Sequence, residues 1–310
     1  MGVHEHLSTY AGLPVARFTD ETAEGAELPP AAEAAWYVAT SFDSESFGDT
    51  FARFRRVVDT TQVTALIFGY WGASYDQEPA DPVDEVMTAA ASLPNLRALF
   101  LGDITGEESE ISWIEQTDIT PLFGSLPYLE RLDIRGAEGL VLEPVKNETL
   151  RTLRFESGGL PARIVQAVGA SELPGLRHLD LWLGEENYGG DTTVADLAPL
   201  LSGERLPALR RLGLEDSEIQ DEIAAAVAGA PVVARLESLS LAMGVLTDRG
   251  AEALLSGQPL THLRELDLHH HFLSDAMMER IRAALPGVQV DLSGQEVPED
   301  GDWFFIEVSE

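Results

Sequence analysis

Leucines at a fixed spacing dominate the second half of the chain. Three segments share the pattern L-x-x-L-x-L, and they begin at Leu209, Leu236 and Leu263. Each segment therefore starts 27 residues after the previous one. Because the second and third leucines of the pattern are two residues apart, both face the same side of an extended strand. The spacing predicts three equivalent strands, each with one buried face.

A helix is expected after each of these strands. Asp221, Asp248 and Asp275 stand where a carboxylate can accept hydrogen bonds from the free N–H groups of a first helical turn. Apolar residues follow at helical spacing. One strand and one helix bury too little surface to fold alone, so neighbouring repeats must stack. The predicted fold is an α/β leucine-rich-repeat solenoid, a horseshoe arc with a parallel inner sheet and outer helices.

The same repeat extends back through most of the chain. Residues 61–293 are predicted to hold eight repeats and a closing strand at 288–292. Residues 1–60 lack the repeat and are predicted to form an N-terminal cap, with a strand at 36–40 and an amphipathic helix at 47–58. Residues 294–310 are predicted to be a C-terminal capping tail, and the whole chain to be one structural domain. The first apolar positions of the eight repeats are Val63, Leu96, Leu129, Leu150, Leu176, Leu209, Leu236 and Leu263.

Three repeats contain extra residues directly after the strand, at 69–81, 102–117 and 182–193. Insertions in a solenoid map to one rim, which is commonly the binding side. These segments carry several aromatic residues, and Trp and Tyr occur both in loop packing and in ligand contact. Both interpretations stay open. The aromatic residues in question include Trp71, Trp113, Trp182 and Tyr188.

Several strings in the long segments and strands resemble an uncharacterised family of bacterial leucine-rich-repeat proteins, and the resemblance covers nearly the whole chain. The repeats look like the ribonuclease-inhibitor type. The resemblance implies the fold and no particular activity, and this chain lacks the usual asparagine ladder after the strand. The strings are Gly102-Asp103-Ile104, Glu107-Glu108-Ser109-Glu110-Ile111-Ser112-Trp113-Ile114, Glu156-Ser157-Gly158-Gly159-Leu160, Leu181-Trp182-Leu183-Gly184, Tyr188-Gly189-Gly190-Asp191 and His269-His270-His271.

Strand positions between and after the leucines are expected to point into the concave side. An inner face built only for solubility would not need Phe100 and Trp182, or the glycines Gly69 and Gly102. The pattern therefore favours a recognition surface. The inner-face candidates are Phe100, Arg135, Asp180, Trp182, Glu215 and His269.

Metal binding and catalysis have little support in the sequence. Asp267 and His269 alternate on one strand, about 6.5–7 Å apart along the backbone, and are a weak candidate pair without a third ligand in reach. The acidic string from Asp103 to Glu110 lacks the spacing of a calcium loop, which leaves a solvated acidic loop or a site for a basic partner. No catalytic template occurs, so we assign no catalytic residue and no cofactor.

The charge of the chain narrows the classes of partner. There are 53 acidic against 20 basic residues, a net charge of −33. This charge excludes binding to nucleic-acid phosphates or to anionic lipid. Three interpretations of it are solubility, attraction of a basic partner and mimicry of a polyanion. The sequence has no cysteine. It also shows no export signal and no apolar run of membrane length, so we expect a cytoplasmic protein.

The sequence thus predicts a non-enzymatic scaffold that binds a protein partner through the concave face and the long loops. One alternative is a small-ligand or metal-binding protein, or an enzyme, with a site at the rim after the strands. The other is an acidic decoy for a basic nucleic-acid-binding protein. The candidate binding residues are Trp71, Phe100, Asp103, Glu107, Glu108, Glu110, Trp113, Arg135, Asp180, Trp182, Tyr188, Asp191, Glu215 and His269.

Overall fold

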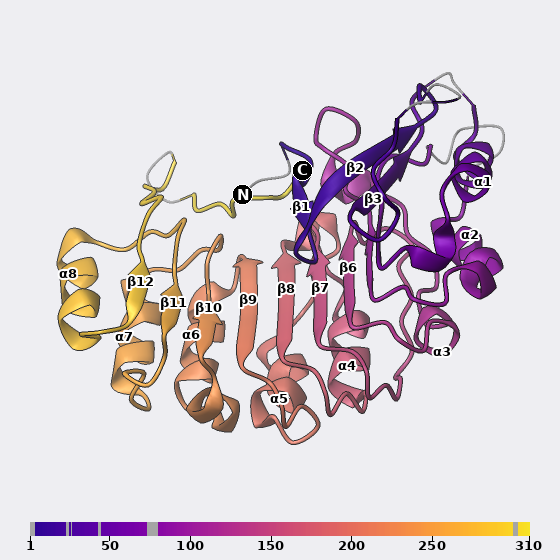
Figure 1. Cartoon of the computed structure of the whole chain (residues 1–310). Coiled ribbons are helices and arrows are strands. Elements are labelled where there is room, and N and C mark those ends of the chain that lie inside the picture. The colour runs from indigo at the N-terminus through magenta and orange to yellow at the C-terminus, as the bar shows by residue number, and fades with distance from the viewer. Residues whose placement is uncertain (1–3, 23–24, 26, 43–44, 73–79, 300–302) are drawn as a thin grey trace. The chain divides into compact units, whose positions relative to one another are not determined.

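The computed structural model describes residues 4–22, 25, 27–42, 45–72, 80–299 and 303–310 (Figure 1). The chain forms two compact units. Unit 1 comprises Met1–Glu143 with Thr149–Thr152 and Glu310, and unit 2 comprises Pro144–Glu148 with Leu153–Ser309. Within each unit the strands follow one another in the sheet in the order of the sequence, as stacked repeats require.

The described residues of unit 1 form six strands and three α-helices. Strands β1 and β2 pair antiparallel, and every later neighbouring pair up to β6 is parallel. The strands are β1 (Thr9–Tyr10), β2 (Leu13–Thr19), β3 (Ala35–Ala39), β4 (Ala65–Phe68), β5 (Ala98–Leu101) and β6 (Arg131–Arg135). The helices are α1 (Phe47–Val57), α2 (Pro82–Ala89) and α3 (Leu122–Ser125), with short 3-10 turns η1 (Thr60–Gln62), η2 (Ala90–Ser92) and η3 (Ile111–Trp113).

Unit 2 contains the more regular repeats. Its helices lie on one face of the sheet (Figure 1), and we call the opposite sheet face of each unit the inner face. The strands are β7 (Thr152–Glu156), β8 (His178–Gly184), β9 (Arg211–Ser217), β10 (Ser238–Ser240), β11 (Glu265–Asp267) and β12 (Gln289–Asp291). The helices are α4 (Ala162–Ala170), α5 (Val194–Ser202), α6 (Gln220–Ala228), α7 (Asp248–Ser256) and α8 (Asp275–Ala284), with 3-10 turns η4 (Glu186–Tyr188) and η5 (Pro231–Arg235).

The leucines predicted to stack do stack. Leu239 of β10 lies directly opposite Leu212 of β9 and Leu266 of β11 in parallel register. All three side chains are buried. Each repeat therefore buries its strand leucines against those of its neighbours. The predicted α/β leucine-rich-repeat solenoid is confirmed in this respect.

The expected helix caps are wrong in detail. Asp248 is the first residue of α7 and Asp221 the second residue of α6, so neither occupies the N-cap position before its helix. Asp221 Oδ1 accepts the backbone N–H of Thr247 at 2.8 Å, and Asp248 Oδ1 accepts that of Ser274 at 2.8 Å. Thr247 and Ser274 cap α7 and α8 through their own hydroxyl oxygens. Each aspartate therefore holds the cap residue of the next repeat, because a nearer side chain or the backbone already serves its own helix.

The N-terminal helix agrees with its predicted apolar stripe. Phe47, Phe51 and Phe54 of α1 are fully buried, and Ser46 caps the helix by accepting the N–H of Asp49. The Phe51 ring lies 5.0 Å from that of Phe68 on β4, between centroids. Aromatic packing thus joins α1 to the first parallel strands. Strands β1 and β2 were not expected from the sequence.

The structure contains no helix, over the described ranges, that is both long and apolar enough to cross a bilayer. The boundaries expected at residues 60 and 293 stay predictions.

We predict that Leu239→Ala lowers the free energy of unfolding by about 2–5 kcal/mol, because it removes a fully buried side chain between two stacked leucines and leaves a cavity. Urea denaturation followed by circular dichroism measures the change. Val297→Ala is the control, since this side chain is 73% exposed. Equal, small effects of the two substitutions would contradict the stacking account.

Candidate functional site

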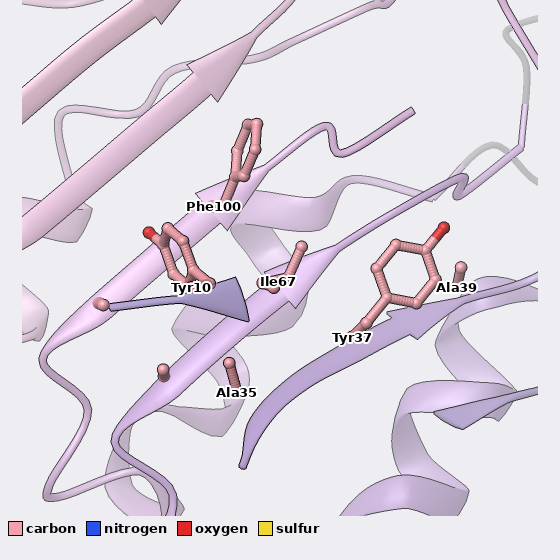
Figure 2. Packing of buried hydrophobic residues seen from close by; sticks show 8 residues of the cluster. Tyr10, Ala35, Tyr37, Ala39, Ile67 and Phe100 are labelled. Atoms are coloured by element: carbon pink, nitrogen blue, oxygen red, sulfur yellow. The ribbon is translucent and has the colours of Figure 1, made fainter. Parts of the chain in front are cut away.

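The inner face of unit 1 is covered by the chain itself. Alternate residues of β3, β4 and β5 form an apolar surface that the N-terminal segment (residues 6–15) packs against (Figure 2). Tyr10 of β1 lies with its ring centroid 6.0 Å from that of Phe100, and its hydroxyl donates to Asp133 Oδ2 at 2.8 Å. The buried cluster comprises Tyr10, Ala35, Tyr37, Ala39, Ala65, Ile67, Ala98 and Phe100, with Leu7, Leu13 and Val15 packed against it.

Polar contacts hold the N-terminal segment in place. The two ring nitrogens of His6 lie 3.6 Å from Asp103 Oδ2 and 3.4 Å from Glu108 Oε2. The Leu7 backbone N–H donates to Asp103 Oδ2 at 3.2 Å. Hydrogen bonds to Asp103 and then to Glu108 raise the pKa of His6 to about 9. His6 is therefore an imidazolium at neutral pH, clamped between two carboxylates.

Two predicted binding residues, Phe100 and Asp103, contact this segment, and Arg135 lies beside them. Phe100, Asp103 and Arg135 are all buried, and Arg135 Nη1 lies 3.6 Å from Asp103 Oδ1. Gly69, one of the glycines that favoured a recognition surface, leaves room for the Tyr37 hydroxyl, because a Cβ there would lie 2.0 Å from that oxygen. These residues support the fold of the N-terminal segment in this structure.

A pocket of about 760 Å³ lies between the loops that follow β4 and β5 in unit 1. It brings together Trp71, Glu107, Glu108, Glu110 and Trp113, all predicted as binding residues. The remaining lining residues are Tyr70, Gly72, Ala80, Asp81, Pro82, Ile104, Gly106, Ser109, Ile114, Glu115, Gln116 and Thr117. Every charged side chain among these described lining residues is acidic. Residues 73–79 of the first long loop lie outside the described residues.

Hydrogen bonds fix the walls of the pocket. Asp81 caps α2 by accepting the N–H groups of Val83 and Asp84, and it also accepts the Thr117 hydroxyl at 3.0 Å, which joins the two loops. Glu108 Oε2 accepts the Thr105 N–H at 2.8 Å. Buried Ile111 and Ile114 hold η3 on either side of Trp113.

The chemistry of the pocket comes from its exposed groups. The Trp113 side chain is 70% exposed. Burial acts against ionisation of Glu108, but the His6 ring and the Thr105 donors outweigh it and lower the pKa of this carboxyl. The pocket thus presents carboxylates beside an aromatic surface, an arrangement that attracts cations.

Unit 2 has a second polar cluster on its inner face. Asp180, Trp182 and Glu215 are buried there, on neighbouring strands β8 and β9. Arg154 Nε donates to Asp180 Oδ2 at 2.8 Å, and Trp182 Nε1 donates to Glu215 Oε2 at 2.9 Å. Gly213 is required beside them, since a Cβ there would lie 2.3 Å from Asp180 Oδ1.

The two carboxyls of this cluster differ in their tendency to ionise. Burial, followed by the charge of Asp180, raises the pKa of Glu215 well above its usual value. Burial also disfavours the charged form of Asp180, but the Arg154 guanidinium overcomes this and lowers the pKa of Asp180. The cluster thus favours the protonated form of Glu215 and the ionised form of Asp180.

The third long loop packs onto the preceding repeat of unit 2. Asp191 Oδ1 accepts the Ala162 N–H at 2.6 Å at the start of α4, and the Glu185 N–H donates to the Gly158 carbonyl at 2.9 Å. Tyr188 ends η4 in this loop, with its carbonyl against Gly159. For this loop, contacts within the fold account for the residues that the sequence marked as candidates.

The weak metal candidates bind each other. His269 Nδ1 lies 2.8 Å from Asp267 Oδ1, and His269 Nε2 lies 3.2 Å from Glu307 Oε2 in the C-terminal tail. Hydrogen bonds to Asp267 and then Glu307 raise the pKa of His269 to about 10. No group of three or more His, Asp or Glu side chains among the residues described here is arranged to hold a metal ion.

Sequence analysis missed several residues that shape these sites. His6, Asp81 and Glu115 belong to the clamp and the pocket of unit 1, and Arg154 and Asp216 to the polar contacts of unit 2. The position of Arg154 between the apolar strand residues Leu153 and Phe155 was the only local signal for any of them. The others act through contacts with distant segments.

A crystal structure of a Bacteroides fragilis protein, a structural-genomics target, is similar to this fold. It aligns with 84% of this chain and 73% of its own chain, with 30% sequence identity and a TM-score of 0.77. This chain belongs to the family of that protein. An internalin structure from Listeria monocytogenes aligns with 85% of this chain and 75% of its own, at 14% identity and a TM-score of 0.40, and contributes nothing further. No family model and no curated protein matches the sequence.

We predict that the His6 clamp stabilises unit 1 in a pH-dependent way. Because the pKa of His6 rises from 6.5 to about 9 on folding, its contribution is complete below pH 6.5 and disappears as the pH rises through about 9. The difference in melting temperature between wild type and His6→Gln should therefore be largest near pH 6. His4→Gln is the control. A difference independent of pH between 6 and 10 would contradict the clamp.

We predict that Glu215 also makes stability fall as the pH rises, here because burial raises the pKa of its carboxyl. Above pH 4.5 the unfolded chain ionises this carboxyl, whereas the raised pKa favours its protonated form in the folded chain, so stability falls as the pH rises towards the folded pKa, by at most about 1.4 kcal/mol per pH unit. Glu215→Gln keeps the acceptor for Trp182 and removes the titration. In urea denaturation between pH 5 and 7, the free energy of unfolding of the variant relative to that of wild type should increase as the pH rises. The exposed control Glu204→Gln should keep a constant stability difference from wild type over this range. The same constant difference for Glu215→Gln would contradict the raised pKa of Glu215.

Proposed function

We propose that the protein is a protein-interaction scaffold whose partner presents a positively charged segment to the pocket of unit 1. The observation that carries the proposal is the combination of an exposed Trp113 with a lining whose described charged groups are all acidic. The carboxylates come from Asp81, Glu107, Glu108, Glu110 and Glu115.

The pocket offers the contacts that interfaces use most. Tryptophan in a depression is a frequent centre of binding energy, and arginine stacks on aromatic rings while pairing with carboxylates. His6 already places one cation against Glu108 from the side of the N-terminal segment. The exposed carboxyls of Glu107, Glu110 and Glu115 make no side-chain hydrogen bond or ion pair within the described part of the chain, which leaves them available to a partner.

The burial of the inner-face candidates restricts the proposal to the loops. Phe100 and Asp103 are buried against the N-terminal segment, Arg135 is buried beside Asp103, and Trp182 is paired with Glu215. A partner would have to displace these contacts to reach them. The loop pocket requires no displacement.

A small organic cation is a second candidate ligand. Its support is the volume of the pocket, which falls within the range of about 300–1,000 Å³ typical of small-molecule sites. The acidic decoy is supported only by the net charge of −33. Repeats of the ribonuclease-inhibitor type and a cytoplasmic location also remain predictions.

The proposal predicts saturable binding of a labelled arginine-rich peptide, measured by fluorescence anisotropy. Trp113→Ala should weaken binding at least about tenfold, as truncation of an interface centre does. The triple substitution Glu107→Gln, Glu110→Gln, Glu115→Gln should weaken it similarly and reduce its salt dependence.

The matched control is the triple substitution Glu21→Gln, Glu33→Gln, Glu143→Gln, which changes the net charge of unit 1 equally at exposed sites outside the pocket lining. If the control weakens binding as much as the pocket triple, attraction is general and the decoy is favoured. If free arginine or choline displaces the peptide with an affinity equal to that of the peptide, a small organic cation is favoured as the ligand of the pocket. Absence of binding would remove the pocket proposal.

A further inference from the structure

Three residues at the carboxyl ends of β9, β10 and β11 share an unusual backbone conformation. Asp216, Met243 and His270 have φ angles of +54°, +67° and +51°, and none of them is glycine. They stand 27 residues apart, the period of the leucine pattern. Asp and His adopt this left-handed conformation more readily than most residues, but methionine has no polar group to stabilise it. Surrounding contacts must hold Met243 there.

Each of these residues makes one hydrogen bond to the same short segment, residues 305–308. Asp216 Oδ1 accepts the Val308 N–H at 3.0 Å, and the Met243 carbonyl accepts the Glu307 N–H at 2.8 Å. His270 Nε2 lies 3.1 Å from the Phe305 carbonyl, and it is the donor because a carbonyl can only accept. The segment runs from β11 towards β9, drawn in yellow along the strand ends in Figure 1.

The side chains of the segment alternate between buried and exposed positions, and its aromatic rings add apolar contacts. Ile306 and Val308 are buried, whereas Glu307 between them is exposed, the alternation of an extended chain. The Phe272 ring meets the rings of Phe304 and Phe305 edge to face, at centroid distances of 4.9 and 5.3 Å.

An ion pair defines one further position of the segment, Glu307. Glu307 pairs with His269, which Asp267 also contacts, and this arrangement keeps His269 protonated at neutral pH. An imidazolium at this place favours a carboxylate and disfavours an ammonium group on the bound segment. The surface thus distinguishes extended segments by both apolar pattern and charge.

Residues 303–308 contact the repeats of unit 2 as a ligand would. They form no strand of the sheet, and the repeat has already ended with β12. Only one of the three hydrogen bonds above joins backbone to backbone. Buried Asp216 depends on the segment, since its Oδ1 bond to Val308 is the hydrogen bond that its carboxyl makes within the described residues.

We propose that the line formed by Asp216, Met243 and His270 is a recognition site for an extended protein segment. The segment has the pattern aromatic, aliphatic, acidic, aliphatic; residues 305–308 occupy the site within the chain, and a partner segment of the same pattern displaces them. The site is independent of the acidic pocket of unit 1 and takes a ligand of the opposite charge. Its test therefore stands or falls separately from that of the arginine-rich peptide.

The test uses the full-length chain carrying Ile306→Ser and Val308→Ser, which weakens the chain's own segment and leaves the site unchanged. The probe is a labelled peptide with the sequence of residues 303–310. It should bind this variant saturably and bind wild type at least about tenfold more weakly, because the tethered segment competes at high effective concentration. A peptide with Glu307→Lys should bind the variant at least about tenfold more weakly than the original peptide.

A scrambled peptide of the same composition is the control. Equal binding of the original, scrambled and Glu307→Lys peptides, or binding of none of them, would overturn the proposal. If the double variant does not fold by circular dichroism, wild-type protein decides the question through hydrogen exchange. Excess original peptide should speed exchange of the Glu307 and Val308 amides and the scrambled peptide should not. Unchanged exchange would overturn the proposal.

Discussion

Lateral packing of leucines between consecutive strands is the interaction on which the structure depends. A single repeat exposes the faces of its strand and helix, and only the next repeat covers them. Leu212, Leu239 and Leu266 stand in register for this reason, and Asp221 and Asp248 reinforce the stacking by holding the cap residue of the following helix. The register in turn fixes which side chains meet on the inner face.

The register explains why the inner faces of both units are largely occupied by contacts within the chain. In unit 1 the inward positions of β3, β4 and β5 are apolar, and the N-terminal segment covers them through Tyr10 and its neighbours. In unit 2 the equivalent positions carry Asp180, Trp182 and Glu215; Arg154 donates to Asp180, and Trp182 donates to Glu215. The loop pocket around Trp113 remains exposed in unit 1, and the charged side chains among its described lining residues are all acidic, with His6 beside Glu108.

The fold could be predicted because its signal is local and repeated. The leucine pattern of each repeat and the stripe of Phe47, Phe51 and Phe54 each involve residues that are close together in the sequence. The loop residues Trp71 and Trp113 were also predicted together, since insertions after neighbouring strands meet at one rim. The His6 clamp and the bond from Val308 to Asp216 could not be predicted, because each joins residues more than ninety positions apart without a repeated pattern. The helix caps were misassigned because a capping aspartate and one that serves the next repeat look identical in sequence.

The central claim is that the N-terminal segment covers the inner face of unit 1 while the loop pocket stays open. Hydroxyl-radical footprinting with mass spectrometry tests it directly, because oxidation of aromatic side chains follows their exposure. The account predicts rapid oxidation of Trp113 and slow oxidation of Tyr10 and Phe100. Oxidation of Tyr10 and Phe100 as fast as that of Trp113 would contradict it.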